Sequence, residues 1–103
     1  MIWKKRKYVI PIKGGKGSIL LDPEYGLIQQ LIVSPKSKDT IWSMEIFDRD
    51  NDSIYTVYDY EGQLNDRNGF PVGKDQMESL MIKFTGLTKN EPISVILNIR
   101  EKG

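Results

Sequence analysis

The chain has 103 residues, a formal net charge of +1, and neither cysteine nor histidine. This length suits one domain, and the two missing residue types exclude disulfides, thiolate metal sites, cysteine nucleophiles and the commonest general base of enzymes. We therefore expect a single domain over residues 1–103 that has no cofactor, no enzymatic activity and, because no run approaches about 20 apolar residues, no segment crossing a membrane.

The chain begins with a cluster of charged and aromatic residues that we take as the candidate partner contact: Lys4, Lys5, Arg6, Lys7 and Tyr8. Cations suit phosphate groups and rings suit stacking, so the cluster contains the ingredients of a nucleic-acid contact. The nearly neutral chain is unlike most dedicated nucleic-acid binders, which are strongly basic. A terminal arm that docks on a protein partner is therefore the favoured hypothesis, with nucleic-acid binding as the alternative.

The same N-terminal region, residues 1–17, is predicted to be a basic strand or arm that ends in a glycine-rich turn. Tyr8, Ile10 and Ile12 alternate as strand residues do, and Pro11 argues for a sheet edge because proline cannot donate to a hydrogen-bond ladder. The run from Lys13 to Ser18 lacks the first glycine of a phosphate-binding loop, so we interpret it as a hinge or wide turn.

Two extended segments follow, Ser18 to Leu21 and Leu27 to Val33, with a turn signal between them. In the second segment apolar residues fall at both odd and even positions, so that a regular strand would place them on both of its faces. This predicts either a strand covered on both faces or a bulge at Gln29 and Gln30 that switches which face each residue joins. A short helix is the competing interpretation.

Residues 41–58 give the clearest structural signal, a hairpin with strands Ile41 to Phe47 and Ile54 to Tyr58 around a polar loop. Along its first strand Trp42, Met44 and Ile46 alternate with polar residues. This alternation is typical of an antiparallel sheet with one face in water.

The hairpin loop places three carboxylates at alternate positions: Asp48, Asp50 and Asp52. Calcium-binding loops of the EF-hand type use such a spacing, and Asp59 is the twelfth residue counted from Asp48. However, Ser53 stands where those loops need glycine, and a strand follows where they have a helix. An Asp-rich turn is the favoured interpretation, and a cation site is the alternative.

From Glu61 to Asp75 the sequence predicts a long irregular connection, with at most a short helix from Lys74 to Ser79. Two alternating patterns, Leu80 to Thr85 and Ile93 to Arg100, predict closing strands joined by a hairpin loop. The whole pattern indicates an all-β fold, a single antiparallel β-sandwich or flattened barrel of about six to seven strands, with its core in residues 18–103.

Four stretches of the chain, taken in order, carry a resemblance to a known class: residues 41–55, 69–73, 86–88 and 93–100. Over Gly26 to Arg100 this order resembles the small β-sandwich structural proteins of tailed-bacteriophage virions. The resemblance implies a repeated, non-catalytic component of a virion head, neck or tail, whose partners are other copies of itself or other virion proteins. It implies no functional residue.

We therefore expect a structural protein that assembles through protein–protein contacts, with residues 2–13 as an arm reaching a neighbouring subunit. On this hypothesis, removal of residues 1–13 leaves a folded domain that no longer assembles. A nucleic-acid-binding module and a small inhibitor or adaptor of one host protein are the alternatives. The basic start has no apolar stretch behind it, so we expect no export signal and a location in the host cytoplasm before assembly and in the virion afterwards.

Overall fold

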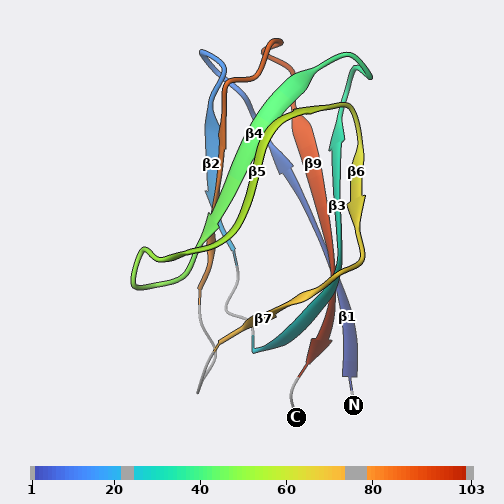
Figure 1. Ribbon diagram of the computed structural model, residues 1–103, viewed down its shortest axis with the longest axis vertical. Helices are drawn as coiled ribbons and strands as arrows, with labels where there is room; N and C mark the ends of the chain where they lie inside the picture. The colour runs from blue at the N-terminus through green and yellow to red at the C-terminus, as the bar shows by residue number, and fades with distance from the viewer. Residues whose placement is uncertain (1, 22–24, 74–78, 102–103) are drawn as a thin grey trace.

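The computed structural model describes residues 2–21, 25–73 and 79–101, and it is built from β-strands (Figure 1). No helix in these ranges is long and apolar enough to span a membrane. The described ranges contain nine strands: β1 (Ile2–Ile10), β2 (Gly17–Leu20), β3 (Gly26–Pro35), β4 (Ile41–Phe47), β5 (Ser53–Glu61), β6 (Leu64–Asp66), β7 (Phe70–Val72), β8 (Met81–Thr85) and β9 (Ile93–Glu101). The number exceeds the expected six or seven.

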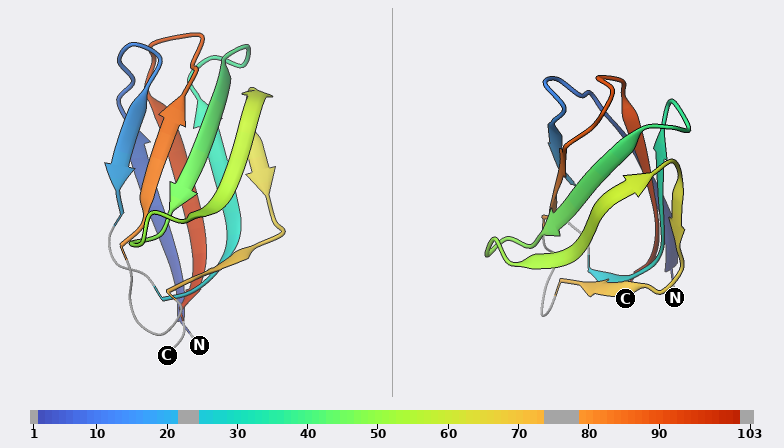
Figure 2. Two further views of the ribbon diagram at one scale, coloured as in Figure 1. Left: turned by 60° about the vertical axis from the view of Figure 1, so that its left-hand side comes forward. Right: turned by 45° about the horizontal axis from the view of Figure 1, so that its top comes forward.

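The strands form two antiparallel sheets packed face to face (Figure 2). One sheet has the order β1-β9-β3-β6, with β7 also paired to β3, and the other has the order β2-β8-β4-β5. The chain changes sheet at every connection except β4 to β5 and β6 to β7. This strand order, with most connections crossing from one sheet to the other, is the topology of a double-sheet jelly roll. The predicted antiparallel sandwich is confirmed, and the barrel alternative is wrong.

Inward-facing side chains of both sheets make one hydrophobic core, as the alternating patterns predicted. Trp42 is fully buried in it, where its ring meets Phe84 edge-on and its Nε1 donates a 2.8 Å hydrogen bond to the carbonyl oxygen of Gly62. Strand β9 lies between β1 and β3 and contributes four fully buried residues: Ile93, Val95, Leu97 and Ile99.

Strand β3 contains a bulge, which was one of the two strand interpretations that its sequence allowed. Its register against β9 shifts between Ile28 and Gln30, so that Gln29 is an extra residue without a partner on β9. Ile28 and Leu31 consequently both point into the core, while Gln30 points out. The helix alternative for this segment is wrong.

The basic N-terminal segment is a strand, and the arm interpretation is wrong for residues 2–10. Strand β1 pairs with β9 along its whole length, from Ile2 opposite Glu101 to Ile10 opposite Ile93. Ile10 is fully buried and Ile12 nearly so. Strand β1 is therefore an edge strand of the sandwich, as Pro11 indicated, and it supplies part of the core.

The glycine-rich segment after β1 is a tight turn. The backbones of Lys13 and Lys16 exchange hydrogen bonds of 2.9 and 3.2 Å, and Gly14 and Gly15 between them have φ values of +62° and +72°. A two-residue turn with both φ values positive suits glycine, which has no Cβ to clash. The segment is therefore a turn, as expected, but it is a tight two-residue turn and not the hinge or wide turn that the sequence suggested.

Two expectations for the C-terminal half are corrected by strand pairing. The connection from residue 61 to residue 75 contains β6 and β7, which both bond to β3 and are too short to show an alternating pattern. Strands β8 and β9 lie in different sheets, so the loop between them crosses the sandwich and is not a hairpin loop. The expected helix from Lys74 to Ser79 falls, except for its last residue, outside the described residues.

Tyr55 links β5 of one sheet to β6 of the other. Its hydroxyl donates a 2.6 Å hydrogen bond to Asp66 Oδ2, and its ring stacks on Phe70 with 4.9 Å between ring centroids. This hydrogen bond holds the pKa of the Asp66 carboxyl below its usual value of 3.8. Desolvation, followed by the hydrogen bond to Asp66, raises the pKa of the Tyr55 phenol above its usual 10.0.

Replacement of Tyr55 by phenylalanine is expected to lower the free energy of unfolding by about 1 kcal/mol at neutral pH. The lowered pKa of Asp66 means that this stabilisation is complete above about pH 4 and disappears as the pH falls through the folded-state pKa. Urea unfolding of both proteins at about pH 7 and about pH 2 measures the difference. If the two proteins differ equally in free energy of unfolding at both pH values, the hydrogen bond does not depend on the charge of Asp66.

Candidate functional site

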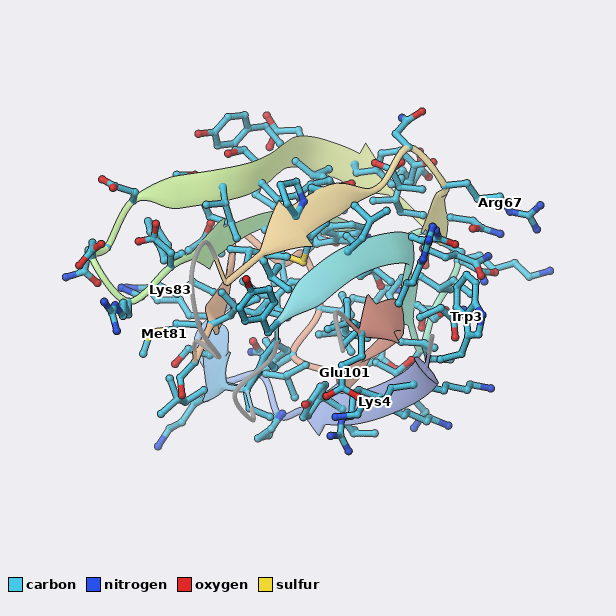
Figure 3. All side chains as sticks on the ribbon, turned by 90° about the horizontal axis from the view of Figure 1, so that it is seen from below. Trp3, Lys4, Arg67, Met81, Lys83 and Glu101 are labelled. Atoms are coloured by element: carbon cyan, nitrogen blue, oxygen red, sulfur yellow. The ribbon has the colours of Figure 1, made fainter. Side chains whose placement is uncertain are left out.

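The five residues of the candidate partner contact do not share one surface. Successive side chains of a strand point to opposite faces, so Lys5 and Lys7 face the solvent outside the sheet, whereas the other three face the opposite way: Lys4, Arg6 and Tyr8. Lys4 Nζ makes a 2.8 Å salt bridge with Glu101 Oε1 at one end of the sandwich (Figure 3). Tyr8 packs against the core. The cluster seen in the sequence is therefore divided by the strand that carries it.

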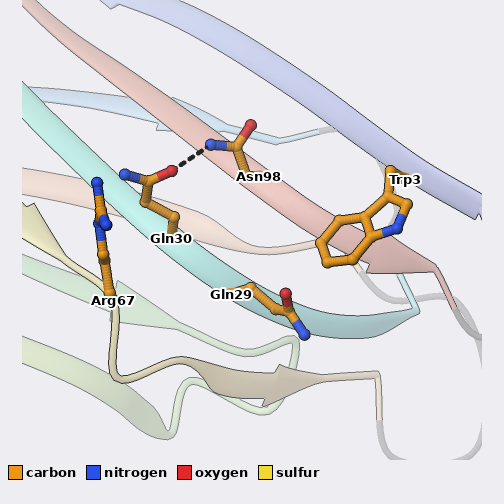
Figure 4. Close-up of a pocket in the computed structure, with 5 residues that line it drawn as sticks. All are labelled: Trp3, Gln29, Gln30, Arg67 and Asn98. Atoms are coloured by element: carbon orange, nitrogen blue, oxygen red, sulfur yellow. Dashed lines mark hydrogen bonds between the residues drawn. The ribbon is translucent and has the colours of Figure 1, made fainter.

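A shallow cavity of about 400 Å³, open to solvent, lies on the outer face of the β1-β9-β3-β6 sheet (Figure 4). Its lining comes from three neighbouring strands and from the segment after β6: Trp3, Gln29, Gln30, Asn98 and Arg67. Trp3 and Arg67 stand at its two ends, with the amide side chains between them. The cavity thus combines one ring, three amides and one guanidinium.

Side-chain amides form a hydrogen-bonded row across this face. Asn98 Nδ2 donates to Gln30 Oε1 at 2.7 Å, and Gln30 Nε2 donates to Asn65 Oδ1 at 2.9 Å. The bulge at Gln29 is what turns Gln30 outward into this row and brings two consecutive glutamines to the same cavity. The row therefore fixes the orientation of the amides that line the cavity.

Positive charge predominates around the cavity. Lys5 lies opposite Asn98 in the pairing of β1 with β9, and Arg100 lies opposite Trp3, so both side chains project from the same outer face. No aspartate or glutamate occupies an outward-facing position on the described parts of β1, β9 or β3. An anionic group at the cavity meets cations without facing a carboxylate on these strands.

The three carboxylates of the β4–β5 loop come together, with one oxygen from each lying within 4.8 Å of the others: Asp48, Asp50 and Asp52. Asp48 is almost completely buried, and its Oδ1 accepts 2.9 Å hydrogen bonds from the backbone N–H groups of Asp50 and Asp52. Asn51 completes the turn at a φ of +63°. These contacts explain the acidic residue at position 48 as a turn residue.

Replacement of Asp48 by alanine is expected to lower the free energy of unfolding by about 1–3 kcal/mol, because two backbone N–H groups lose a charged acceptor. Asp50 is exposed, so the matched change to alanine there should alter stability by less than about 0.5 kcal/mol. Thermal melts measure both, with and without about 1 mM calcium. Equal effects of the two substitutions would contradict the turn role, and a raised midpoint in calcium would show a cation site.

An apolar row crosses the outer face of the other sheet. Leu20 of β2 lies opposite Met81 of β8, which lies opposite Phe47 of β4. Leu20 is 63% exposed, and Lys83 Nζ lies 5.3 Å from the centre of the Phe47 ring. Met81 and Lys83 lie on the side of the molecule away from Trp3 and Arg67 (Figure 3). The outer face of this sheet thus carries one apolar row beside polar residues such as Ser18, Lys83 and Glu45.

Sequence reasoning found only part of the polar cavity. It singled out the N-terminal cluster and the bulge at Gln29 and Gln30, but it did not connect them or identify Asn98 and Arg67. The sequence feature that could have pointed to this site is Asn98, because an amide in the middle of the apolar strand β9 is unusual.

No protein-family model and no curated protein sequence matches the chain. Among solved structures, it is similar to chains in the structures of the Gx and Gt strains of infectious bursal disease virus, with TM-scores of 0.31 and 0.32. Sequence identity is 9% in both cases, and each match covers 96% of this chain and 37% of the viral chain. This chain thus spans little more than a third of the viral chains, and no residue role transfers from them.

Proposed function

We propose that this protein is a non-catalytic structural protein that assembles through protein–protein contacts as a repeated component of a phage virion. The observation that carries the proposal is the apolar row of Leu20, Met81 and Phe47 on the outside of the β2-β8-β4-β5 sheet. Burial of apolar surface contributes about 25 cal/mol per Å². A neighbouring subunit that covered this row would bury its apolar surface, and this burial would favour association.

Charge distribution supports a head-to-tail contact between copies. The acidic β4–β5 loop projects from one side of the molecule, and β1 with its cations lies on the other side (Figure 1). A contact between two different patches repeats from copy to copy, which builds rings or filaments instead of closed pairs. Complementary charge also fixes the orientation in which subunits meet.

The partners on this proposal are other copies of this chain or other virion proteins. The double-sheet jelly roll is an architecture that viral capsid domains use, although one fold serves many functions. The protein would work in the virion, after synthesis in the host cytoplasm, without a cofactor and without catalysing a reaction.

The apolar row is tested by replacement of Leu20 with glutamate. We expect the wild-type protein to form oligomers whose mass rises with concentration, and the variant to stay a monomer, because a buried carboxylate opposes association. Ile41 is the matched control, since it is an exposed apolar residue at the end of β4 away from Phe47, and its change to glutamate should leave assembly intact. Light scattering measures the mass, and the absorbance ratio at 260 and 280 nm detects nucleic acid.

A wild-type protein that remains monomeric at all concentrations would contradict self-assembly. Equal loss of assembly in both variants would show that the apolar row is not the interface. A nucleoprotein absorbance ratio would favour nucleic-acid binding, which we do not propose because β1 divides its basic residues between two faces.

A further inference from the structure

We infer that the cavity on the outer face of the β1-β9-β3-β6 sheet binds a short acidic saccharide. This function goes beyond assembly, because it uses the sheet opposite the apolar row. The inference rests on a ring, a fixed set of amides and a group of cations that meet at one place on the surface.

Trp3 supplies a flat apolar platform at one end of the cavity. Its side chain is 58% exposed, whereas Trp42 is fully buried in the core. A sugar ring presents a face of C–H groups, and these pack on the electron-rich face of an indole. Stacking on Trp3 would remove apolar area from water while leaving the sugar hydroxyls at the ring edge free to bond.

The amide row supplies the partners for those hydroxyls. Each hydroxyl both donates and accepts, as a primary amide also does. Asn98 and Gln30 each use one N–H in the row, which leaves the second N–H of each and the Asn98 Oδ1 for a ligand, together with the amide of Gln29. Because the row holds these groups in place, little side-chain freedom is lost when a sugar binds.

The cations select an acidic sugar over a neutral one. Arg67 stands at the end of the cavity away from Trp3, and its planar guanidinium matches a carboxylate with two parallel hydrogen bonds (Figure 4). Lys5 and Arg100 project from the same outer face. A carboxylate on the sugar would therefore enter a site of favourable potential.

The geometry favours a saccharide over a single-stranded nucleic acid. Nucleic-acid strands bind by stacking successive bases on several rings along a groove. Among the outward-facing residues of β1, β9, β3 and β6 in the described part of the chain, Trp3 provides the only aromatic ring. A cavity of about 400 Å³ with one ring suits a short saccharide.

The test uses the fluorescence of the full-length protein with succinimide as a quencher. Succinimide reaches the exposed Trp3 and not the buried Trp42, so the quenchable emission reports on the cavity. The probes are tetragalacturonate, neutral galactotetraose and the oligonucleotide (dT)5. We expect tetragalacturonate to reduce the quenching of Trp3 with a dissociation constant below about 1 mM, and the other two probes to leave it unchanged.

Two matched arginine variants identify the contact. Arg67→Gln is expected to weaken tetragalacturonate binding about tenfold, because it removes the bidentate partner of the carboxylate. The same change at Arg49, in the acidic β4–β5 loop, is expected to leave the affinity unchanged within about twofold. Circular dichroism of both variants should match the wild-type spectrum, since both side chains are exposed.

Four results would overturn the inference. If about 10 mM tetragalacturonate does not protect Trp3 from succinimide, acidic saccharides are excluded as the ligand. Equal protection by galactotetraose, or protection by (dT)5 alone, would assign the site to neutral sugars or to nucleic acid. If Trp3 of the wild-type protein resists succinimide before any probe is added but becomes quenchable in the Leu20→Glu monomer, the cavity belongs to an interface between copies. Light scattering of the same samples tests assembly independently of binding.

Discussion

Replacement of Trp42 by alanine is expected to lower the free energy of unfolding by about 3–5 kcal/mol. The Trp42 ring is fully buried and lies 5.9 Å from the Phe84 ring and 5.5 Å from the Tyr60 ring, measured between centroids. Its loss would leave a large cavity and would also remove the 2.8 Å hydrogen bond to the carbonyl oxygen of Gly62. Since small domains have a total stability of about 5–15 kcal/mol, the variant should be marginally folded.

Urea unfolding measures this loss, and the chain offers a matched control. Trp3 undergoes the same change of side chain when replaced by alanine, but it is 58% exposed, so its stability effect should stay within about 0.5 kcal/mol. A loss below about 1 kcal/mol for Trp42→Ala would mean that this residue contributes little to the stability of the core.

Deletion of residues 2–13 is expected to abolish cooperative folding. This reverses the expectation from the sequence, in which the segment was a dispensable arm. Strand β1 pairs with β9 at nine positions, and the deletion also removes Ile10 and Ile12 from the core. Without β1, the apolar strand β9 would have an unpaired edge. The measurement is a thermal melt followed by circular dichroism.

A pair of single substitutions on β1 tests the same point without removing a strand. Ile10 is fully buried, so its change to alanine should lower the free energy of unfolding by about 2–5 kcal/mol. Val9 is 58% exposed, and its change to alanine should cost less than about 0.5 kcal/mol. A truncated protein that still melts cooperatively would restore the arm interpretation.

Local patterns in the sequence predicted the fold class and several of its parts. The β4–β5 hairpin was predictable because alternation over adjacent residues and an Asp-rich turn both act within a short stretch of chain. The bulge at Gln29 and Gln30 was predictable because apolar residues changed parity there. These signals depend only on neighbours along the chain.

Strand partners were not predictable in the same way. Strands β6 and β7 are each three residues long and exist because they bond to β3, which is distant in the sequence. The loop after β8 resembled a hairpin loop, yet it carries the chain to the opposite sheet. Pairing across the sandwich depends on long-range contacts that a period-two pattern does not encode.

The sequence by itself determined that this protein is a small antiparallel β-sandwich, because side-chain alternation and turn residues are local properties. Only the tertiary structure decided which of its polar residues act together. The basic cluster separated because neighbouring strand residues point to opposite faces, whereas Trp3, Gln30, Asn98 and Arg67 converged because strand register aligns distant segments. The candidate site is thus a product of register, which arises only when the strands pair.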